Sequence, residues 1–386
     1  MTTETLVNQT GLPPDSPEFK SCCLLSELRV PSRFCLSILE EPGYIQQFLS
    51  SPIETLKNIG FQRRDEERTR PISAIMDRVA EQIDRGKRSG IFVLTPNQGL
   101  PSALRTLPNA PCWMFIKGSY LPQDAIAVSI VGPRASTSYG RDVTRKLVEV
   151  LTPFCTIVSG MALGIDTTAH ETALERGGRT LGVAGCGLDV DYPQGNEGVR
   201  KRIPSQGAML SLYPPGTPAN RQNFPERNGI IAGLCPLTIV VEASVKSGAL
   251  ITARLAAEYG REVAAVPGDI TRPNSEGANQ LLLEGAIPIV RPGDALLLME
   301  KHFLAYQKQS PTSDETAKST LLPEMNNTQT LIYERIRHEA VSYDALQMEM
   351  VPEHMGIGVF TTSLLELEMM GLVKSGPGRV YQAKLR

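Results

Sequence analysis

The sequence predicts an α/β protein with a mostly parallel sheet, preceded by a helical N-terminal domain and followed by a winged helix. Three observations support this prediction. In residues 91–305, short runs rich in β-branched residues alternate with helical patterns, which is typical of a parallel sheet covered by helices. Residues 1–90 contain helix-like stretches between polar loops. Residues 327–386 contain three helical patterns followed by a hairpin.

The central region supplies the strands and helices of the predicted sheet. Apolar runs typical of buried strands lie at 127–131, 156–159, 180–184, 208–211, 237–241, 262–266 and 287–290. Apolar residues at helical spacing predict helices between them, among others at 140–151, 167–176, 250–259 and 279–284. Ligands of open parallel sheets bind beyond the carboxyl ends of the strands, so we expect the functional site at that edge.

Three further segments complete the predicted organisation. Residues 1–90 form the helical N-terminal domain, with a clear helical pattern at 72–85 and a charged, solvated run at 63–70. Residues 306–326 are polar, contain two prolines and are typical of a linker. The last domain, 327–386, has helices at 329–338, 343–349 and 361–370 and a Gly-Pro-Gly hairpin at 371–381, which indicates a winged helix. Its third helix carries two glutamates and no basic residue, which favours protein contact or packing over reading of duplex DNA.

Bulk properties narrow the class of protein. The chain has 386 residues, of which 41% are hydrophobic, enough for a sizeable core in two or three domains. Its formal net charge is −2, so any anion site must be local. Seven scattered cysteines without a CxxC motif, and a first segment unlike a secretory signal, favour a reduced cytoplasmic compartment. The apolar runs are far shorter than the roughly 18 residues of a membrane span.

Glycine-bearing segments follow the predicted strands and should meet at one edge of the sheet, at 132–140, 159–166, 185–196, 224–233 and 242–253. Backbone N–H groups at helix N-termini there would attract phosphate. Positive charge is added at the same edge by four side chains: Arg134, Arg221, Arg227 and Lys246. These features predict a local site for an anionic ligand.

Phe224 stands between two of these arginines in the sequence. An aromatic ring flanked by cations can stack on a nucleobase while the cations hold phosphates. A structural alternative is that Phe224 starts a helix and packs into the core. Arg227 can likewise be a structural ion-pair partner, for which Glu226 and Glu242 are the candidates.

Motifs of common enzymes are missing from the sequence. Neither GxxxxGK[ST] nor GxGxxG occurs, and no Cys/His cluster has metal-ligand spacing, so we expect no cofactor and no metal. Ser159, His170 and Asp189 can be assembled into a triad on paper, but nothing in their spacing favours it. His170 is interpreted as structural. We therefore expect a protein that is not an enzyme.

Six ordered segments resemble the DNA-processing protein A family, also called DprA or Smf: IVGPRASTSYG, VSGMALGIDTTAHETAL, GVAGCGLDVDYPQGN, FPERNGIIAGL, VVEASVKSGALITARLAAEYGREVAAVPG and EGANQLLLEGA. The resemblance covers about residues 95–300, and LLELEMMGLVKSGPGRVYQ resembles the winged-helix tail of many members. It implies an extended Rossmann-like domain that binds single-stranded DNA. It also implies protection of incoming strands in natural transformation and recombination, loading of the RecA recombinase, and a homodimer, for which the apolar segment 281–290 is the candidate edge.

The resemblance also implies which residues touch DNA. Arg134 contacts phosphates, Arg221 binds DNA three residues before the aromatic, Phe224 stacks on a base, and the backbone at Gly132 lies close to the strand. The complete predicted DNA-binding set is Gly132, Arg134, Ser136, Ser159, Gly160, Arg221, Phe224, Arg227, Asn228 and Lys246.

The chain departs from the family pattern at four positions. Pro133 replaces the usual serine of Gly-Ser-Arg, Gly229 replaces the last arginine of FPxRNR, Leu212 replaces the acid of SExP, and Ala249 replaces the serine of SGSL. Three of these changes, at Pro133, Gly229 and Ala249, remove donors, so we expect a weakened affinity for DNA.

Two other functions stay open from the sequence. Related Rossmann-like enzymes hydrolyse nucleoside monophosphates. The nearest match here to their PGGxGTxxE-type segment, FPERNGIIAG, lacks the working glutamate after the glycines. The third possibility is a regulatory module that senses a nucleotide and reports through the winged helix.

Overall fold

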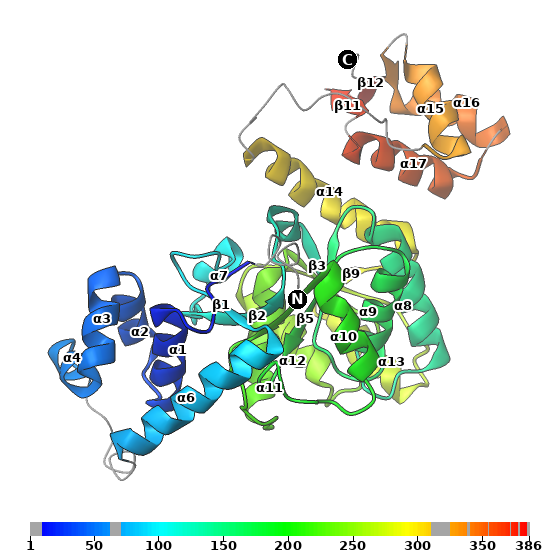
Figure 1. Cartoon of the computed structure of the whole chain (residues 1–386). Helices are drawn as coiled ribbons and strands as arrows, with labels where there is room; N and C mark the ends of the chain where they lie inside the picture. The colour runs from blue at the N-terminus through cyan, green and yellow to red at the C-terminus, as the bar shows by residue number, and fades with distance from the viewer. Residues whose placement is uncertain are drawn as a thin grey trace. The chain divides into compact units, whose positions relative to one another are not determined.

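The computed structural model describes residues 10–61, 71–309, 325–337, 340–353, 355–370, 372–376 and 379–383. The chain divides into two compact units, Met1–Ile289 and Val290–Arg386 (Figure 1). The division precedes the expected end of the central domain at residue 305, and helix α14 (Pro292–Gln309) runs across that position. Most of the expected linker, the charged run 63–70, and part of the Gly-Pro-Gly turn lie outside the described residues.

One mixed sheet forms the centre of the first unit. Within the described residues its order is β1-β2-β6-β5-β4-β3-β7-β8-β9, and only the pairs β1–β2 and β2–β6 are antiparallel. The strands are β1 (Phe92–Leu94), β2 (Met114–Gly118), β3 (Ala127–Val131), β4 (Thr156–Ser159), β5 (Thr180–Ala184), β6 (Gly207–Ser211), β7 (Leu237–Val240), β8 (Glu262–Ala265) and β9 (Ile287–Pro288). This confirms the α/β fold class with a mostly parallel sheet and the positions of all the predicted strands, to within two residues. The two antiparallel strands β1 and β2 were not predicted.

Helices cover both faces of this sheet. The helices that connect or flank its strands are α7 (Ser102–Arg105), the 3-10 helix η2 (Pro122–Ala125), α8 (Ser138–Leu151), α9 (Ile165–Glu175), α10 (Glu197–Gln206), α11 (Asn223–Leu234), α12 (Gly248–Glu258) and α13 (Pro273–Leu283). Helix α9 contacts α8 and α10, whereas α11 contacts α7 and α12, so two separate layers form. The segment 224–233, predicted as a glycine loop, is the body of α11. That prediction was wrong because Pro225 is tolerated in a first turn and Gly233 makes room for Leu107 of the neighbouring layer.

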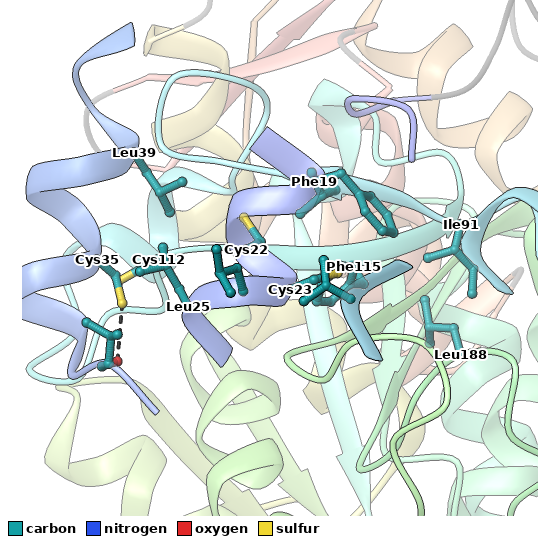
Figure 2. Close-up of a cluster of buried hydrophobic side chains, with 14 of the residues drawn as sticks. Phe19, Cys22, Cys23, Leu25, Cys35, Leu39, Ile91, Cys112, Phe115 and Leu188 are labelled. Atoms are coloured by element: carbon teal, nitrogen blue, oxygen red, sulfur yellow. Dashed lines mark hydrogen bonds between the residues drawn. The ribbon is translucent and has the colours of Figure 1, made fainter. Parts of the chain in front are cut away.

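The N-terminal helices pack at the β1–β2 edge of the sheet (Figure 1). They are α1 (Pro17–Glu27), α2 (Ser32–Leu39), α3 (Pro42–Ser50), α4 (Pro52–Asn58) and α6 (Ile72–Ser89). Their apolar side chains form a single cluster with residues of the sheet, drawn in Figure 2. Phe19 and Phe115 meet edge to face within it, with ring centroids 5.2 Å apart. The N-terminal helices therefore share their hydrophobic core with the central region.

The second unit contains the elements expected of a winged helix. They are α15 (Asn327–Ile336), β10 (Val341–Ser342), α16 (Tyr343–Glu353), α17 (Ile357–Met369), β11 (Val373–Gly376) and β12 (Val380–Ala383). The three strands form an antiparallel sheet in the order β10-β12-β11. Phe360, Leu364 and Leu367 of α17 point into the core of this unit, because these positions recur at helical spacing. The assignment as a winged helix stays a prediction.

Candidate nucleic-acid interface

The order of the parallel strands positions the site. From β3 the chain adds strands on one side, up to β6, and then returns to place β7 on the other side of β3. The loops after β3 and β7 therefore diverge, and a crevice opens beyond the carboxyl ends of these strands. A pocket of about 270 Å³ lies there, lined by residues of both loops and of α11: Val131, Gly132, Pro133, Arg134, Ala162, Asp166, Phe224, Arg227, Asn228, Ile231, Ser244, Ser247, Gly248, Ala249 and Thr252.

Phe224 lies in the first turn of α11 at this pocket. The guanidinium carbon Cζ of Arg134 is 5.5 Å from the ring centroid, and that of Arg227 is 5.7 Å away. Tyr192 lies on the same ring, with the centroids 5.8 Å apart and the planes inclined by 33°. Phe224 therefore starts a helix, as one alternative held, but its ring is only half-buried and contacts two cations.

Arg227 is a buried cation, with only 6% of its surface exposed. Its Nη1 donates to the carbonyl oxygens of Gly160 and Val183, the latter at 2.9 Å. Burial lowers its pKa, and the nearby Asp166 carboxylate opposes that shift. The prediction of Glu226 or Glu242 as the ion-pair partner of Arg227 was wrong. Arg227 instead donates to backbone carbonyls of segments that are distant in the sequence.

A carboxylate of the protein, that of Glu242 after β7, already lies against the loop that follows β3. Thr137, the N-cap of α8, donates to the Glu242 carboxylate through its backbone N–H at 3.0 Å and its hydroxyl at 2.5 Å. Glu242 is 3% exposed and lies against the first turn of α8, where a negative charge is favourable. The backbone N–H and hydroxyl of Thr137 are therefore not available to the phosphate expected at this helix N-terminus. Gly132 is required for packing, since a Cβ there would lie 2.4 Å from Ile165 Cγ1.

The loop after β4 is filled in the same way. The backbone N–H groups of Gly160 and Ala162 both donate to Asp166 Oδ2, at 3.1 and 3.2 Å. The buried Ser159 hydroxyl donates to the Ile130 carbonyl at 2.6 Å. Burial raises the pKa of Asp166, and Arg227 opposes this shift. Ser159 and Gly160 were expected to contact DNA, but their polar groups are committed inside the protein.

The remaining predicted residues fall into two groups. Ser136 accepts from Arg141, and the nearly buried Asn228 donates to the Gly248 carbonyl at 3.3 Å. Arg134, Arg221 and Lys246 are exposed, and no carboxylate among the described residues forms an ion pair with them. The structure thus brings Gly132, Arg134, Phe224, Arg227 and Asn228 to one pocket, and leaves Arg221 and Lys246 outside its lining.

Sequence reasoning missed the residues that hold the loops in place. Asn196, almost fully buried, donates to the Met161 carbonyl at 2.9 Å and accepts from the Thr167 hydroxyl at 2.9 Å. It thereby joins the loop after β4 to the segment 185–196. Tyr192, which lies on Phe224, was also missed, although an aromatic beside a proline in a glycine loop is a usable signal.

Ser159, His170 and Asp189, considered above as a catalytic triad, have separate hydrogen-bond partners. The Thr180 hydroxyl donates to the Ile157 carbonyl, so Nδ1 of His170 donates to Thr180, 2.7 Å away. Burial lowers the pKa of His170 to about 3, with a further contribution from Arg227, so the ring is neutral. Asp189 accepts from the Gly216 N–H at 2.7 Å and pairs with Arg85. His170 is therefore structural, as interpreted from the sequence.

Two kinds of site are absent from the described part of the chain. No group of three or more potential metal-ligating side chains occurs there. No helix among the same residues combines the length and apolar character needed to cross a membrane.

Comparison with known proteins identifies the family. Residues 92–300 match the family model described as DNA recombination-mediator protein A. The chain belongs to this family. It is 34% identical over 325 residues to Protein Smf of Synechocystis, covering 75% of this chain and 80% of the relative. It is 42% identical over 224 residues to DNA processing protein DprA of Streptococcus pneumoniae, covering 57% of this chain and 79% of the relative.

Two solved structures of the family are similar to the fold. The X-ray structure of DprA from Streptococcus pneumoniae has a TM-score of 0.54 and 34% identity, and covers 65% of this chain and 92% of its own. DNA processing protein A from Helicobacter pylori, described in its single-stranded DNA binding mode, has a TM-score of 0.50 and 30% identity, and covers 55% and 96%. These likenesses confirm the extended Rossmann-like fold expected for the DprA family.

The departures from the DprA motifs fall into two places. Pro133 and Ala249 line the pocket at the sheet edge, so the hydroxyls expected there are absent from its wall. Leu212 and Gly229 line a different cleft, between α11 and the N-terminal helices. A Cβ at position 229 would meet the Tyr259 hydroxyl at 3.1 Å. The expectation that Gly229 removes a cation from the DNA pocket was therefore wrong, because this position faces the other side of α11.

Proposed function

We propose that this protein binds single-stranded DNA at the carboxyl edge of its sheet. The observation that carries the proposal is the half-buried Phe224 ring at the pocket, whose centroid lies 5.5 Å from Cζ of Arg134 and 5.7 Å from Cζ of Arg227. Base stacking on an aromatic ring tolerates any sequence, and neighbouring cations attract the phosphates. The Helicobacter pylori relative, whose structure concerns single-stranded DNA binding, supports this ligand.

The charge for backbone contacts comes from three exposed side chains, which we call the cationic rim: Arg134, Arg221 and Lys246. Each follows the carboxyl end of a different strand, so the rim spans the edge on which the pocket opens. Exposed cations without a carboxylate partner keep their full charge for a ligand. A chain of net charge −2 therefore presents a local anion-binding track.

In cells, we propose, the bound strand is protected in the cytoplasm and RecA is loaded onto it during transformation or recombination. A homodimer would join two tracks. The candidate interface is the segment 281–290, where Leu283 is 84% exposed beside β9, the edge strand of the sheet. Such an exposed apolar side chain beside an edge strand suits a second copy of the chain.

We propose a role without catalysis, which the contacts of the pocket carboxylate support. Asp166 Oδ2 accepts two backbone N–H groups and the carboxylate lies beside Arg227, so this oxygen holds the loop. A nucleotide hydrolase needs a carboxylate or histidine free to move a proton. Nothing in the geometry of the described pocket favours the hydrolase alternative.

Fluorescence anisotropy of a labelled poly-dT strand, against a duplex of equal length over a salt series, tests the proposal. We expect preferential binding of the single strand and a negative dependence of affinity on salt. The double variant Arg134→Glu/Arg221→Glu should lose at least tenfold in affinity, because two attractive contacts become repulsive.

A matched double variant separates the effect of position on DNA affinity from the effect of net charge. Arg145→Glu/Arg176→Glu makes the same change in charge on α8 and at the end of α9, away from the cationic rim. We expect it to bind DNA within about twofold of the parent protein. Equal losses in the two double variants, or equal affinity of the parent for duplex and single strand, would refute the proposal.

A further inference from the structure

A second large cavity lies on the opposite side of α11 from the DNA pocket. It has a volume of about 770 Å³ and opens between the N-terminal helices and the layer of α11 and α12. Glu226 and Gly229 of α11 line it, whereas Phe224 and Arg227 of the same helix line the DNA pocket. Its wall also contains two thiols, those of Cys35 and Cys112.

The two thiols come from segments far apart in the sequence. Cys35 lies on α2, and Cys112 lies two residues before β2. Figure 2 shows both side chains in the cluster shared by the N-terminal helices and the sheet. The Cys35 thiol donates to the Val30 carbonyl, with Sγ 3.2 Å from the oxygen. The Cys112 thiol lies against the same helix α2, because its carbonyl partner Ser32 is the first residue of that helix. Cys112 Sγ is 3.2 Å from the Ser32 carbonyl oxygen.

We propose that Cys35 and Cys112 are a redox-active pair that forms a reversible intramolecular disulfide when a peroxide enters this cavity. The pairing needs two neighbouring thiols and a path for a small oxidant. Both thiols line the wall of one cavity, and Cys112 lies against the first turn of the helix that contains Cys35. In a reducing compartment such a disulfide is transient, as is typical of redox-sensing pairs.

The two thiols differ in a way that assigns their roles. The hydrogen bond from Cys35 lowers the pKa of Cys112, whereas the same bond raises the pKa of Cys35. The thiolate is the reactive form, so Cys112 attacks first and Cys35 resolves. By contrast, burial raises the pKa of Cys22, Cys23, Cys155 and Cys235, which lie outside the cavity lining.

The chemistry balances with hydrogen peroxide as the oxidant. The Cys112 thiolate attacks one peroxide oxygen, the O–O bond breaks, and a sulfenic acid and hydroxide form, the latter taking a proton to become water. The Cys35 sulfur then attacks the sulfenic sulfur, its thiol proton leaves with the hydroxyl group as a second water, and the S–S bond forms. Two thiols are oxidised and one peroxide is reduced to two waters.

Peptide mapping of the intact chain tests the proposal directly. The native protein is treated with hydrogen peroxide, blocked with N-ethylmaleimide and digested with trypsin without reduction. Trypsin separates Cys35 (peptide 34–57), Cys112 (peptide 106–117) and the pair Cys22 and Cys23 (peptide 21–29). We expect a cross-linked species of peptides 34–57 and 106–117, which disappears after dithiothreitol. Its absence, or a dominant link to peptide 21–29, would overturn the proposal.

Single variants test the assigned roles. Cys35→Ser should leave a sulfenic acid on Cys112 that dimedone traps, whereas Cys112→Ser should leave no dimedone adduct on Cys35. Cys22→Ser is the matched control and should keep the link between peptides 34–57 and 106–117. Dimedone labelling of Cys35 in the Cys112→Ser variant would contradict the assignment. If a variant fails to fold, the peptide map of the parent chain still decides whether the pair exists.

Discussion

The glycine loops and the cationic rim lie at the same edge of the sheet, but their polar groups are satisfied in opposite ways. The loops after β3 and β4 direct their N–H groups to carboxylates of the protein, Glu242 and Asp166. The rim residues Arg134 and Arg221 are exposed and have no described carboxylate partner. Under the proposed function the difference separates two tasks, since the loops would hold the edge while the rim and Phe224 would meet the strand.

The largest effect on stability is expected from the loop after β3. Replacing Glu242 by Ala leaves the buried donors of Thr137 without an acceptor and should lower the free energy of unfolding by about 3 kcal/mol. Urea unfolding measures this loss. Glu171→Ala, at an exposed position of α9, is the control and should change stability by less than about 0.5 kcal/mol. Equal losses of unfolding free energy in the two variants would show that Glu242 does not hold the loop after β3.

Two glycines at the same edge sharpen the comparison between the loops and the rim. A Cβ on Gly160 would lie 2.2 Å from Arg227 Nη1 and 2.9 Å from Asp166 Oδ2, so Gly160→Ala should cost about 2 kcal/mol of stability. Gly248 has nothing within 4 Å of the added atom. Gly248→Ala should therefore be neutral or slightly stabilising. Thermal unfolding of both variants compares them, and a tolerated Gly160→Ala would show that the loop after β4 is looser than described.

His170, buried below these loops, predicts a dependence of stability on pH. Its pKa falls from 6.5 to about 3 on folding, so the unfolded chain takes up a proton in this interval while the folded chain does not. Stability should therefore fall as the pH drops below 6.5, by about 2 kcal/mol at pH 5. Urea titrations at pH 7.5 and pH 5 should show a smaller difference for His170→Asn, which keeps a donor for Thr180. An unchanged difference in that variant would assign the pH dependence to other groups.

The smallest effect on stability is expected at the rim. Arg134→Ala should change the free energy of unfolding by less than about 0.5 kcal/mol, because the side chain is exposed. The same change should reduce the slope of log affinity against log salt by roughly 0.7, for one lost contact to a single-stranded phosphate. Anisotropy titrations at several salt concentrations measure the slope, with Arg145→Ala as the control. A loss of stability without a change in the salt slope would show that Arg134 stabilises the fold and does not contact a phosphate.

The parallel part of the fold was predictable because each buried strand is a short apolar run between a helix and a glycine loop. The antiparallel strands β1 and β2 were missed, since they are short and lie outside that alternation. Helix α11 was read as a loop because its proline and glycines are usual loop signals. Only the packing of Gly233 against Leu107 explains why a helix needs a glycine at this position.

The site was predictable only in part. Arg134 and Phe224, which carry residue types suited to nucleic-acid binding, line the pocket, whereas Arg221 lies outside its lining. The partners of the loop N–H groups were not predicted, because hydrogen bonds such as that from Thr137 to Glu242 join positions more than a hundred residues apart. A motif shows which residues lie near a ligand, but not which donors the protein uses itself.

One consequence concerns small competing ions. The anion position at the start of α8 is taken by Glu242, so a free phosphate finds no converging set of N–H donors there. What the edge offers is a row of separate single charges, each weak alone. Binding of this kind grows by avidity with the number of linked phosphates, so a long strand is held where inorganic phosphate or a single nucleotide is not. Under the proposed function, the protein would thereby select for polymer length without any contact that measures length.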